Sequence, residues 1–150
     1  MIGIFLLGTA LAGTHQLGVS AGGTASAGLK TMIPAYGPDV AAWWSLSGER
    51  HGVQVELKNY SLLASQELNH LPGLSVGWSA RWGERGYSVL GAGGYLNEVI
   101  VALPIVSAEL GVELGVGDGD LRIRCGGQGL WVPPTFAAGG GVRLSAVWRL

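Results

Sequence analysis

Two stretches of strict alternation, joined by a tight turn signal, constrain the fold of this chain more than any other feature. Every second residue is apolar across positions 106–116, and the same alternation returns across 121–125. A side-chain period of two is that of a β-strand with one apolar and one polar face. Asp118-Gly119, between the two stretches, is typical of a two-residue type I′ turn. The sequence therefore predicts a long β-hairpin whose register sets Glu113 opposite Arg124 on the polar face.

The strands of this hairpin are long enough to cross a membrane. Each has about ten or more alternating residues, whereas an ordinary globular strand has about five or six, and about nine to eleven tilted residues span a bilayer. Of the 150 residues, 13% are charged and 48% are hydrophobic, and 27 are glycine. Soluble domains have about 25% charged residues. Because no run reaches about 18 uninterrupted apolar residues, the composition favours a transmembrane β-barrel over helical spans.

Further alternating segments bring the predicted number of strands to eight. The expected strands lie near residues 17–29, 40–46, 53–57, 74–82, 87–91, 99–116, 121–131 and 136–150. Three of the connections are tight, and most of the others are longer. An even strand number, with short turns at one end and longer loops at the other, predicts an all-β fold, an eight-stranded antiparallel up-and-down transmembrane barrel.

Two Gly-Glu-Arg segments predict two-residue turns between neighbouring strands. Such turns set Leu46 opposite Val53, and Trp82 opposite Tyr87. In both cases the apolar faces of the paired strands coincide.

Several segments interrupt the alternation. Residues 30–39 are expected to form a loop, and residues 61–71 a short helix or an ordered loop. The apolar parity changes between Ile105 and Val106, which predicts a bulge or a late strand start. Residues 1–12 are apolar and end in a small-x-small pattern, which indicates an export signal with a truncated start, or else an early first strand. The remaining residues, 13–150, are expected to form a single barrel domain.

The composition of the two faces predicts which one is inside. The polar face is mostly glycine, serine and alanine with a few charges, which suits a narrow lumen better than a solvated surface. The apolar face is therefore expected to contact lipid, with interfacial aromatic residues at its ends. The predicted aromatic girdles are Trp44, Trp82, Tyr87 and Trp148 at the tight-turn end, and Tyr60, Tyr95, Trp131 and Phe136 at the other. The alternative is a soluble, calycin-like ligand-binding barrel with the apolar face inside.

In architecture, residues 14–150 resemble the small eight-stranded outer-membrane proteins of bacteria, the class of the OmpA membrane domain and OmpX. The last strand carries an alternating pattern similar to the signal read by the barrel-insertion machinery, in Val142, Leu144, Ala146, Trp148 and Leu150. That signal normally ends in an aromatic residue, and Leu150 departs from it. The resemblance implies a bacterial outer-membrane location, with outer-membrane lipid and the insertion machinery as partners. It also implies that the longer loops could present an extracellular ligand site.

Charged residues on the polar face are expected to fill the lumen as a paired network, because unpaired charges in a narrow, poorly hydrated interior are costly. The predicted network comprises Gln54, Glu56, Arg81, Glu109, Glu113, Arg122, Arg124 and Arg143, with Arg149 at its edge. An eight-stranded interior filled in this way leaves no wide pore.

The function predicted from the sequence is structural or one of surface interaction, without catalysis, metal or cofactor. A net charge of −1 offers no basic footprint for nucleic acid. The alternative is a lipid-modifying enzyme with a site at the membrane rim, because such chemistry needs a histidine near a serine or a carboxylate. The candidate centre is His70, with Ser61, Ser65, Glu67 and Asn69 nearby in sequence.

Overall fold

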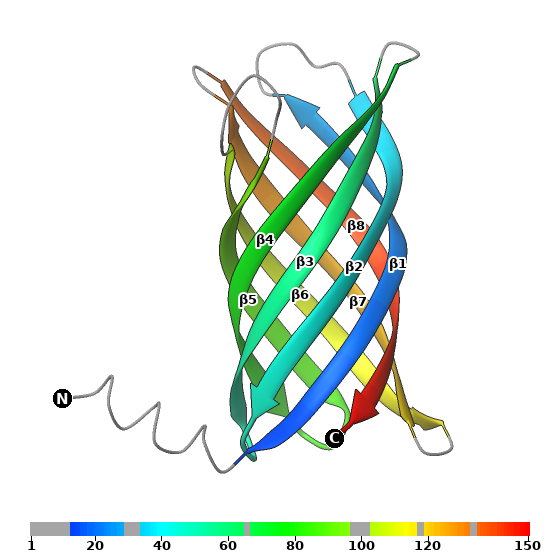
Figure 1. The fold of residues 1–150 in the computed structure, drawn as a ribbon, viewed down its shortest axis with the longest axis vertical. Helices are drawn as coiled ribbons and strands as arrows, with labels where there is room; N and C mark the ends of the chain where they lie inside the picture. Colours follow the sequence, from blue (N-terminus) through cyan, green and yellow to red (C-terminus); the bar gives the residue numbers. More distant parts are fainter. Residues whose placement is uncertain (1–12, 29–33, 65–66, 97–102, 117–118, 133–134) are drawn as a thin grey trace, which may run out of the picture.

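A computed structural model describes residues 13–28, 34–64, 67–96, 103–116, 119–132 and 135–150. Eight strands form a closed antiparallel barrel, as Figure 1 shows, and this confirms the predicted fold class. The strands are β1 (Thr14–Gly28), β2 (Pro34–Ser47), β3 (His51–Ala64), β4 (Glu67–Trp82), β5 (Gly86–Tyr95), β6 (Leu103–Val116), β7 (Gly119–Val132) and β8 (Thr135–Arg149). No described segment forms a helix of the length and apolarity needed to cross a membrane.

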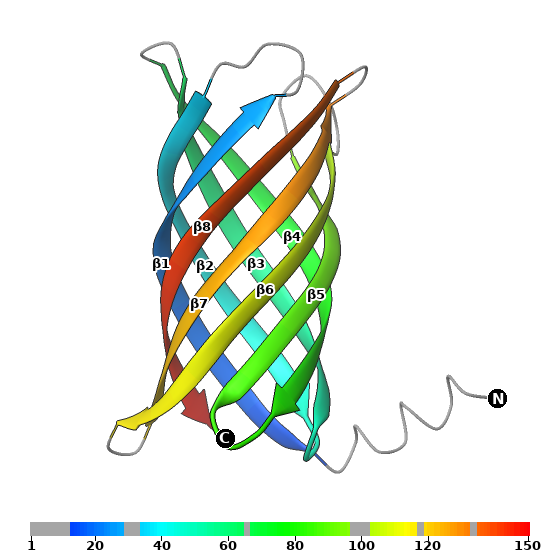
Figure 2. The same cartoon turned by 180° about the vertical axis from the view of Figure 1, so that it is seen from behind.

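Each strand pairs with its neighbours in the chain, and β1 pairs with β8 to close the barrel. The closing ladder runs from Gln16 opposite Arg149 to Gly28 opposite Ala137. Closure leaves no free sheet edge among the described strands, so their backbone groups are paired within the barrel. The C-terminus and the start of β1 lie at one end, together with the β2–β3, β4–β5 and β6–β7 connections (Figures 1 and 2). We call this the turn end, and the opposite one the loop end.

The two faces of the sheet differ sharply in chemistry. On the outer face, apolar side chains are widely exposed, for example Leu57 at 63% and Val106 at 60%. On the inner face, polar side chains are buried, for example Arg124 and Ser145 at 1% each. The alternation puts every charged side chain that the structure describes within the strands on the inner face. The outer wall is therefore an uncharged apolar surface around a charged interior.

The β6–β7 register differs from the predicted one by two residues. Glu113 lies opposite Arg122, and Arg124 lies opposite Gly111. Gly119, predicted to be in the turn, is the first residue of β7, and residues 117–118 lie outside the described chain. A slip of two residues leaves every side chain on its own face, so the alternation could not distinguish the two registers.

The β4–β5 turn contains three residues, one more than predicted. Trp82 pairs with Gly86, and Arg81 pairs with Tyr87. Gly83 adopts a left-handed conformation (φ 67°), which glycine tolerates without steric cost and which suits a three-residue hairpin loop. The extra residue changes the parity, so Tyr87 lies on the inner face rather than on the outer one.

Two segments expected to be irregular are largely extended instead. β2 begins at Pro34, although residues 30–39 were predicted to form a loop. Residues 61–64 and 67–71 belong to β3 and β4, so the predicted helix or ordered loop is wrong. Of the loop-end connections, 65–66 and 133–134 are consequently short, and 29–33 and 96–102 are longer. Proline is tolerated at the first residue of a strand, which is why Pro34 does not prevent pairing.

The bulge predicted near Ile105 is absent from the described part of β6. Ile105 pairs with Leu130 and Val106 with Gly129 in an unbroken ladder. Ile105 is 2% exposed because it points into the barrel. The strand therefore runs regularly through this point, and the apparent break in the alternation arises because Ile105 is an apolar residue on the inner face.

Gly22 and Gly23 offer a matched test of the close contact between β1 and β8. A Cβ atom on Gly22 would lie 2.2 Å from the carbonyl oxygen of Val142, whereas one on Gly23 would meet nothing within 4 Å. We expect Gly22→Ala to lower the free energy of unfolding by about 1–3 kcal/mol, because the closing ladder resists displacement. Gly23→Ala should change it by less than about 0.5 kcal/mol. Urea unfolding in detergent micelles, followed by tryptophan fluorescence, measures both, and equal losses would contradict the close approach.

Candidate functional site

The interior of the barrel is closed at the loop end by an apolar cluster. It consists of Tyr60, Leu71, Tyr95 and Ile105, none more than 7% exposed. The rings of Tyr60 and Tyr95 stack with their centroids 5.7 Å apart. Packed aromatic and aliphatic side chains therefore separate the polar interior from the loop end.

Below this cluster lies a set of buried charges that we call the central network. Its members are Asp39, Glu56, Lys58, Glu109, Arg124 and Arg143, each 9% exposed or less. With three acidic and three basic side chains, the network carries no net formal charge. Gln54 adds a hydrogen bond from its Nε2 to Glu56 Oε2, at 3.0 Å.

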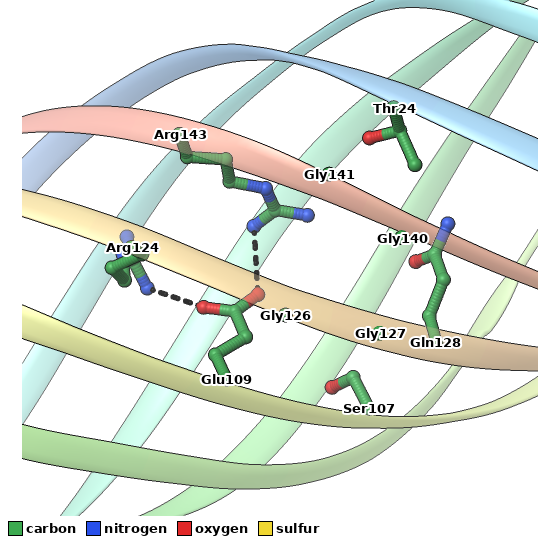
Figure 3. A pocket seen from close by; sticks show the side chains of 10 residues that line it. All are labelled: Thr24, Ser107, Glu109, Arg124, Gly126, Gly127, Gln128, Gly140, Gly141 and Arg143. Carbon is green, nitrogen blue, oxygen red and sulfur yellow. Dashed lines mark hydrogen bonds and ion pairs between the residues drawn. The ribbon is translucent and has the colours of Figure 1, made fainter.

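Arg143 contacts all three carboxylates of the central network. Its guanidinium lies 2.6 Å from Asp39 Oδ2, 2.5 Å from Glu56 Oε1 and 3.3 Å from Glu109 Oε1. Arg124 is directly opposite Arg143 in the β7–β8 ladder. Like charges in that position repel each other, but Glu109 lies between them, and its Oε2 accepts a hydrogen bond from Arg124 Nη1 at 3.1 Å (Figure 3).

Lys58 joins the central network to the apolar cluster. Its Nζ is 3.9 Å from Glu56 Oε1 and 5.8 Å from the centroid of the Tyr95 ring. Lys58 and Asp39 were both missing from the predicted network. Lys58 is two residues after Glu56 on the same face, so strand parity could have found it. Asp39 could not be found in this way, because its segment was expected to be a loop.

A second set of charges, the turn-end network, occupies the other mouth of the barrel. It comprises Arg81, Glu113, Asp120, Arg122 and Arg149. Glu113 accepts hydrogen bonds from Arg122 Nε, from Arg81 Nη2 at 2.7 Å and from Arg149 Nη2 at 3.3 Å. Arg122 also donates to Gln16 Oε1 at 2.6 Å. Three arginines face two carboxylates here, and the side chain of Arg149 is half exposed at the mouth.

Trp43 separates the two networks. It is 3% exposed, and the guanidinium carbons of Arg122 and Arg124 lie 4.9 Å and 5.4 Å from its ring. Arg122 also lies 5.1 Å from the ring of Tyr87. Cation–π contacts of this kind stabilise a desolvated guanidinium without adding a second charge.

Three of the predicted girdle residues lie inside the barrel. Tyr60, Tyr87 and Tyr95 are 1%, 4% and 0% exposed. Their hydroxyl groups suit a polar lumen, and one of them, Tyr95 Oη, donates to Gln128 Oε1 at 3.1 Å. The prediction of an outer position was wrong for all three. The extra turn residue after Trp82 moves Tyr87 and Tyr95 of β5 inside, whereas Tyr60, expected beyond the end of its strand, continues β3 at an inward position.

The tryptophans at the turn end do face outward. Trp44, Trp78, Trp82 and Trp148 are 36–52% exposed, and we call them the tryptophan belt. His15 lies against Trp44, and His51 stacks on Trp78 with centroids 5.1 Å apart. Trp78 was not among the predicted girdle residues. The side chains of Trp131 and Phe136 lie outside the described residues.

Two small cavities lie in the lumen between the described side chains. One, of about 20 Å³, lies beside Glu109, Gln128 and Thr24, next to the glycines of β7 and β8 (Figure 3). Another of the same volume lies near Gln54 and Arg122 toward the turn end. Each has room for about one water molecule. Within the described part of the chain, no three His, Cys, Asp or Glu side chains are grouped to hold a metal ion.

Two of the residues predicted at the rim come together on the outside of the barrel. Ser61 Oγ lies 2.9 Å from His70 Nδ1. Both residues point outward near the loop end, because their neighbours Tyr60 and Leu71 point inward. Residues 65–66 and the side chains of residues 67 and 69 lie outside the described part of the chain.

Comparison with solved structures supports the barrel fold. Ail, the attachment invasion locus protein of Yersinia pestis, in complex with the heparin analogue sucrose octasulfate, has a TM-score of 0.54 and 12% sequence identity. The alignment covers 89% of this chain and 99% of Ail. A second structure of the same protein has a TM-score of 0.53 at 10% identity, covering 91% and 99%. No protein-family model matches the sequence, and no curated protein matches it. The resemblance to small eight-stranded outer-membrane barrels is therefore confirmed at the level of the fold.

The observed register predicts which charges are coupled. In a double-mutant cycle, Glu113→Ala with Arg122→Ala should show a coupling energy of about 1–3 kcal/mol, because the two side chains are in contact. Glu113→Ala with Arg124→Ala should be additive within about 0.5 kcal/mol, because Arg124 contacts Glu109 instead. Urea unfolding of the single and double variants measures both cycles. The opposite ranking would restore the register expected from an Asp118-Gly119 turn.

The packing of the lumen predicts that the barrel conducts no large current. The apolar cluster and the central network occupy the described lumen, and the two cavities between them and their neighbours each have room for about one water molecule. We expect single-channel recordings in planar bilayers to show no large, stable conductance. A steady porin-like conductance would contradict the filled interior.

Proposed function

We propose that the protein is a bacterial outer-membrane barrel with a sealed interior, which acts through its lipid-facing wall and its loop end. The observation that carries this proposal is the segregation of charge. The described strands put their charged side chains inside, and their outer face is apolar. A barrel in water would need charges on that outer face, whereas hydrocarbon excludes them.

The height of the apolar band fits a bilayer. On β4, Trp78 of the tryptophan belt and His70 near the loop end are eight residues apart. At about 3.3 Å per residue and a tilt of about 40°, they are separated by about 20 Å along the barrel axis. An outer-membrane barrel has an apolar band about 25 Å tall, bounded by aromatic residues. We place the turn end on the periplasmic side, where short turns are found in such barrels.

The contents of the barrel weigh against the soluble ligand carrier. Such a carrier needs an interior cavity for its ligand. The described interior instead holds a neutral network of six charges with cavities of about 20 Å³. An apolar ligand would have to displace paired charges, which is costly.

The loop end of this chain does not offer the charges that a ligand such as the one bound to Ail needs. A polysulfated sugar such as sucrose octasulfate is recognised through clustered lysine and arginine side chains. The sequences of the four loop-end connections contain one lysine, Lys30, and one acidic residue, Glu98. We therefore assign the loop end a role in surface contacts without a polyanion as ligand.

Site-directed spin labels test the membrane placement. We expect labels at Leu57, Val106 and Val142 to be accessible to oxygen and shielded from a water-soluble relaxation agent in reconstituted vesicles, because these side chains are exposed on the outer wall. A label at Glu84, in the exposed β4–β5 turn, is the control and should show the opposite accessibility. Strong exposure of the three wall sites to the water-soluble agent would refute the proposed function.

A further inference from the structure

We propose that Ser61 and His70 form a nucleophile–base pair that cleaves an ester-linked acyl chain from a membrane lipid at the loop-end rim. The proposal rests on the proposed function for its substrate, because the membrane placement brings lipid to this face. It departs from the expectation that the protein has no catalytic activity.

The geometry of the pair is that of an activated serine. Ser61 on β3 and His70 on β4 are direct ladder partners, which holds their side chains on one face. The distance of 2.9 Å from Ser61 Oγ to His70 Nδ1 is within hydrogen-bond reach. A serine hydroxyl at this distance from an imidazole nitrogen is the arrangement by which a histidine activates a nucleophile. When the ring carries its proton on Nε2, Nδ1 accepts the serine proton.

His70 differs from the two other histidines on the outer face. His15 and His51 lie near the turn end, against the tryptophan belt, where aromatic contacts account for them. His70 instead contacts a serine at the opposite rim of an otherwise apolar wall. His70 marks the loop-end edge of the apolar band, so its contact with Ser61 lies at the membrane interface, where the polar ester of a lipid would meet it.

An apolar groove on the outer wall reaches the outward-facing ladder row next to this pair. Ala21 and Ala42 form part of its floor, with Leu57 and Leu74 toward one side and Leu121 and Leu144 toward the other. Along its edge the groove is lined by Asn59 and Pro72, which are ladder partners. The next row is Tyr60 and Leu71, whose side chains point into the barrel, so Ser61 and His70 form the next outward-facing row in that direction.

The order of polarity along this surface matches one class of ligand. An acyl chain ends in a polar ester, and the groove leads from alkyl side chains to Asn59, Ser61 and His70. The groove lies on the wall that we place against hydrocarbon. We therefore assign it to the acyl chain of a lipid in the leaflet at the loop end.

The reaction is an acyl transfer followed by hydrolysis. Ser61 Oγ attacks the ester carbonyl carbon while its proton passes to His70 Nδ1. The carbon–oxygen bond of the ester then breaks, and the proton moves from His70 to the leaving alcohol oxygen. A water molecule repeats the sequence on the acyl-serine, releases the fatty acid and restores Ser61.

A fluorophosphonate probe tests the pair independently of the membrane placement. We expect the full chain in detergent micelles to be labelled covalently, and Ser61→Ala to lose the label. His70→Asn should slow labelling by about 100-fold or more, the usual contribution of a general base. Ser61 is 6% exposed, so a small probe reaches the hydroxyl more readily than a lipid does. Ser88→Ala, at another outward-facing serine, is the matched control and should be labelled like the wild type.

The substrate class is tested by incubating the protein with phospholipid vesicles and, separately, with lipopolysaccharide, and by measuring released fatty acid. Release in either arm that disappears in Ser61→Ala supports the proposal and identifies the lipid. Absence of labelling in the wild type, or labelling that survives in Ser61→Ala, overturns it. Heat-modifiable gel mobility shows whether each variant is folded. In a Cys125→Ala background, which removes the exposed native thiol, Ser61→Cys should be labelled by a thiol-reactive acyl probe, and adding His70→Asn should slow that labelling. Failure of these tests leaves the spin-label test of the membrane placement unaffected.

Discussion

The structure depends on the cancellation of charge inside a space too narrow to hydrate it. Six charged side chains of the central network are buried, and each would be costly if it were unpaired. Arg143 meets this constraint by contacting Asp39, Glu56 and Glu109 together. These four residues come from β8, β2, β3 and β6, so the network ties together strands that are not neighbours in the ladder. Backbone hydrogen bonds close the barrel wall, and the paired charges of the central network occupy the space inside it.

The sequence predicts the number of strands and the face of most side chains, because the period of two along each strand does not depend on how the strands are paired. It does not predict register itself. The slip of two residues that pairs Glu113 with Arg122 keeps every face intact, whereas the extra turn residue after Trp82 moves Tyr87 inside. Both depend on the length of a turn, and after Trp82 the left-handed conformation of Gly83 accommodates the extra residue. Asp39 was missed for another reason: its strand begins in a segment rich in proline and glycine, whose pairing comes from the neighbouring strands.

The packing of side chains in the described lumen favours a function at the outer surface of the barrel. The apolar cluster closes the loop end, and the turn-end network occupies the other mouth, so neither transport nor storage follows from the described lumen. The outer wall is uniform except near its rims. Ser61 and His70 were named together as rim candidates from the sequence. Their pairing across a ladder was not predicted, because residues 61–71 were expected to form a helix or loop and only the β3–β4 ladder makes the two residues partners. The barrel thus acts as a rigid frame that holds a polar pair at the edge of an apolar surface.

The stabilising role of the central network is tested most directly by the free energy of unfolding of Arg143→Met in lipid vesicles. Methionine preserves much of the side-chain volume but leaves three buried carboxylates without their shared cation. We predict a loss of about 3–5 kcal/mol, the usual cost of removing one partner from a buried ionic contact. Arg50→Met, at an exposed turn-end arginine, should change the free energy by less than about 0.5 kcal/mol. An equally small effect of Arg143→Met would contradict the claim that a charge-balanced network holds the barrel together.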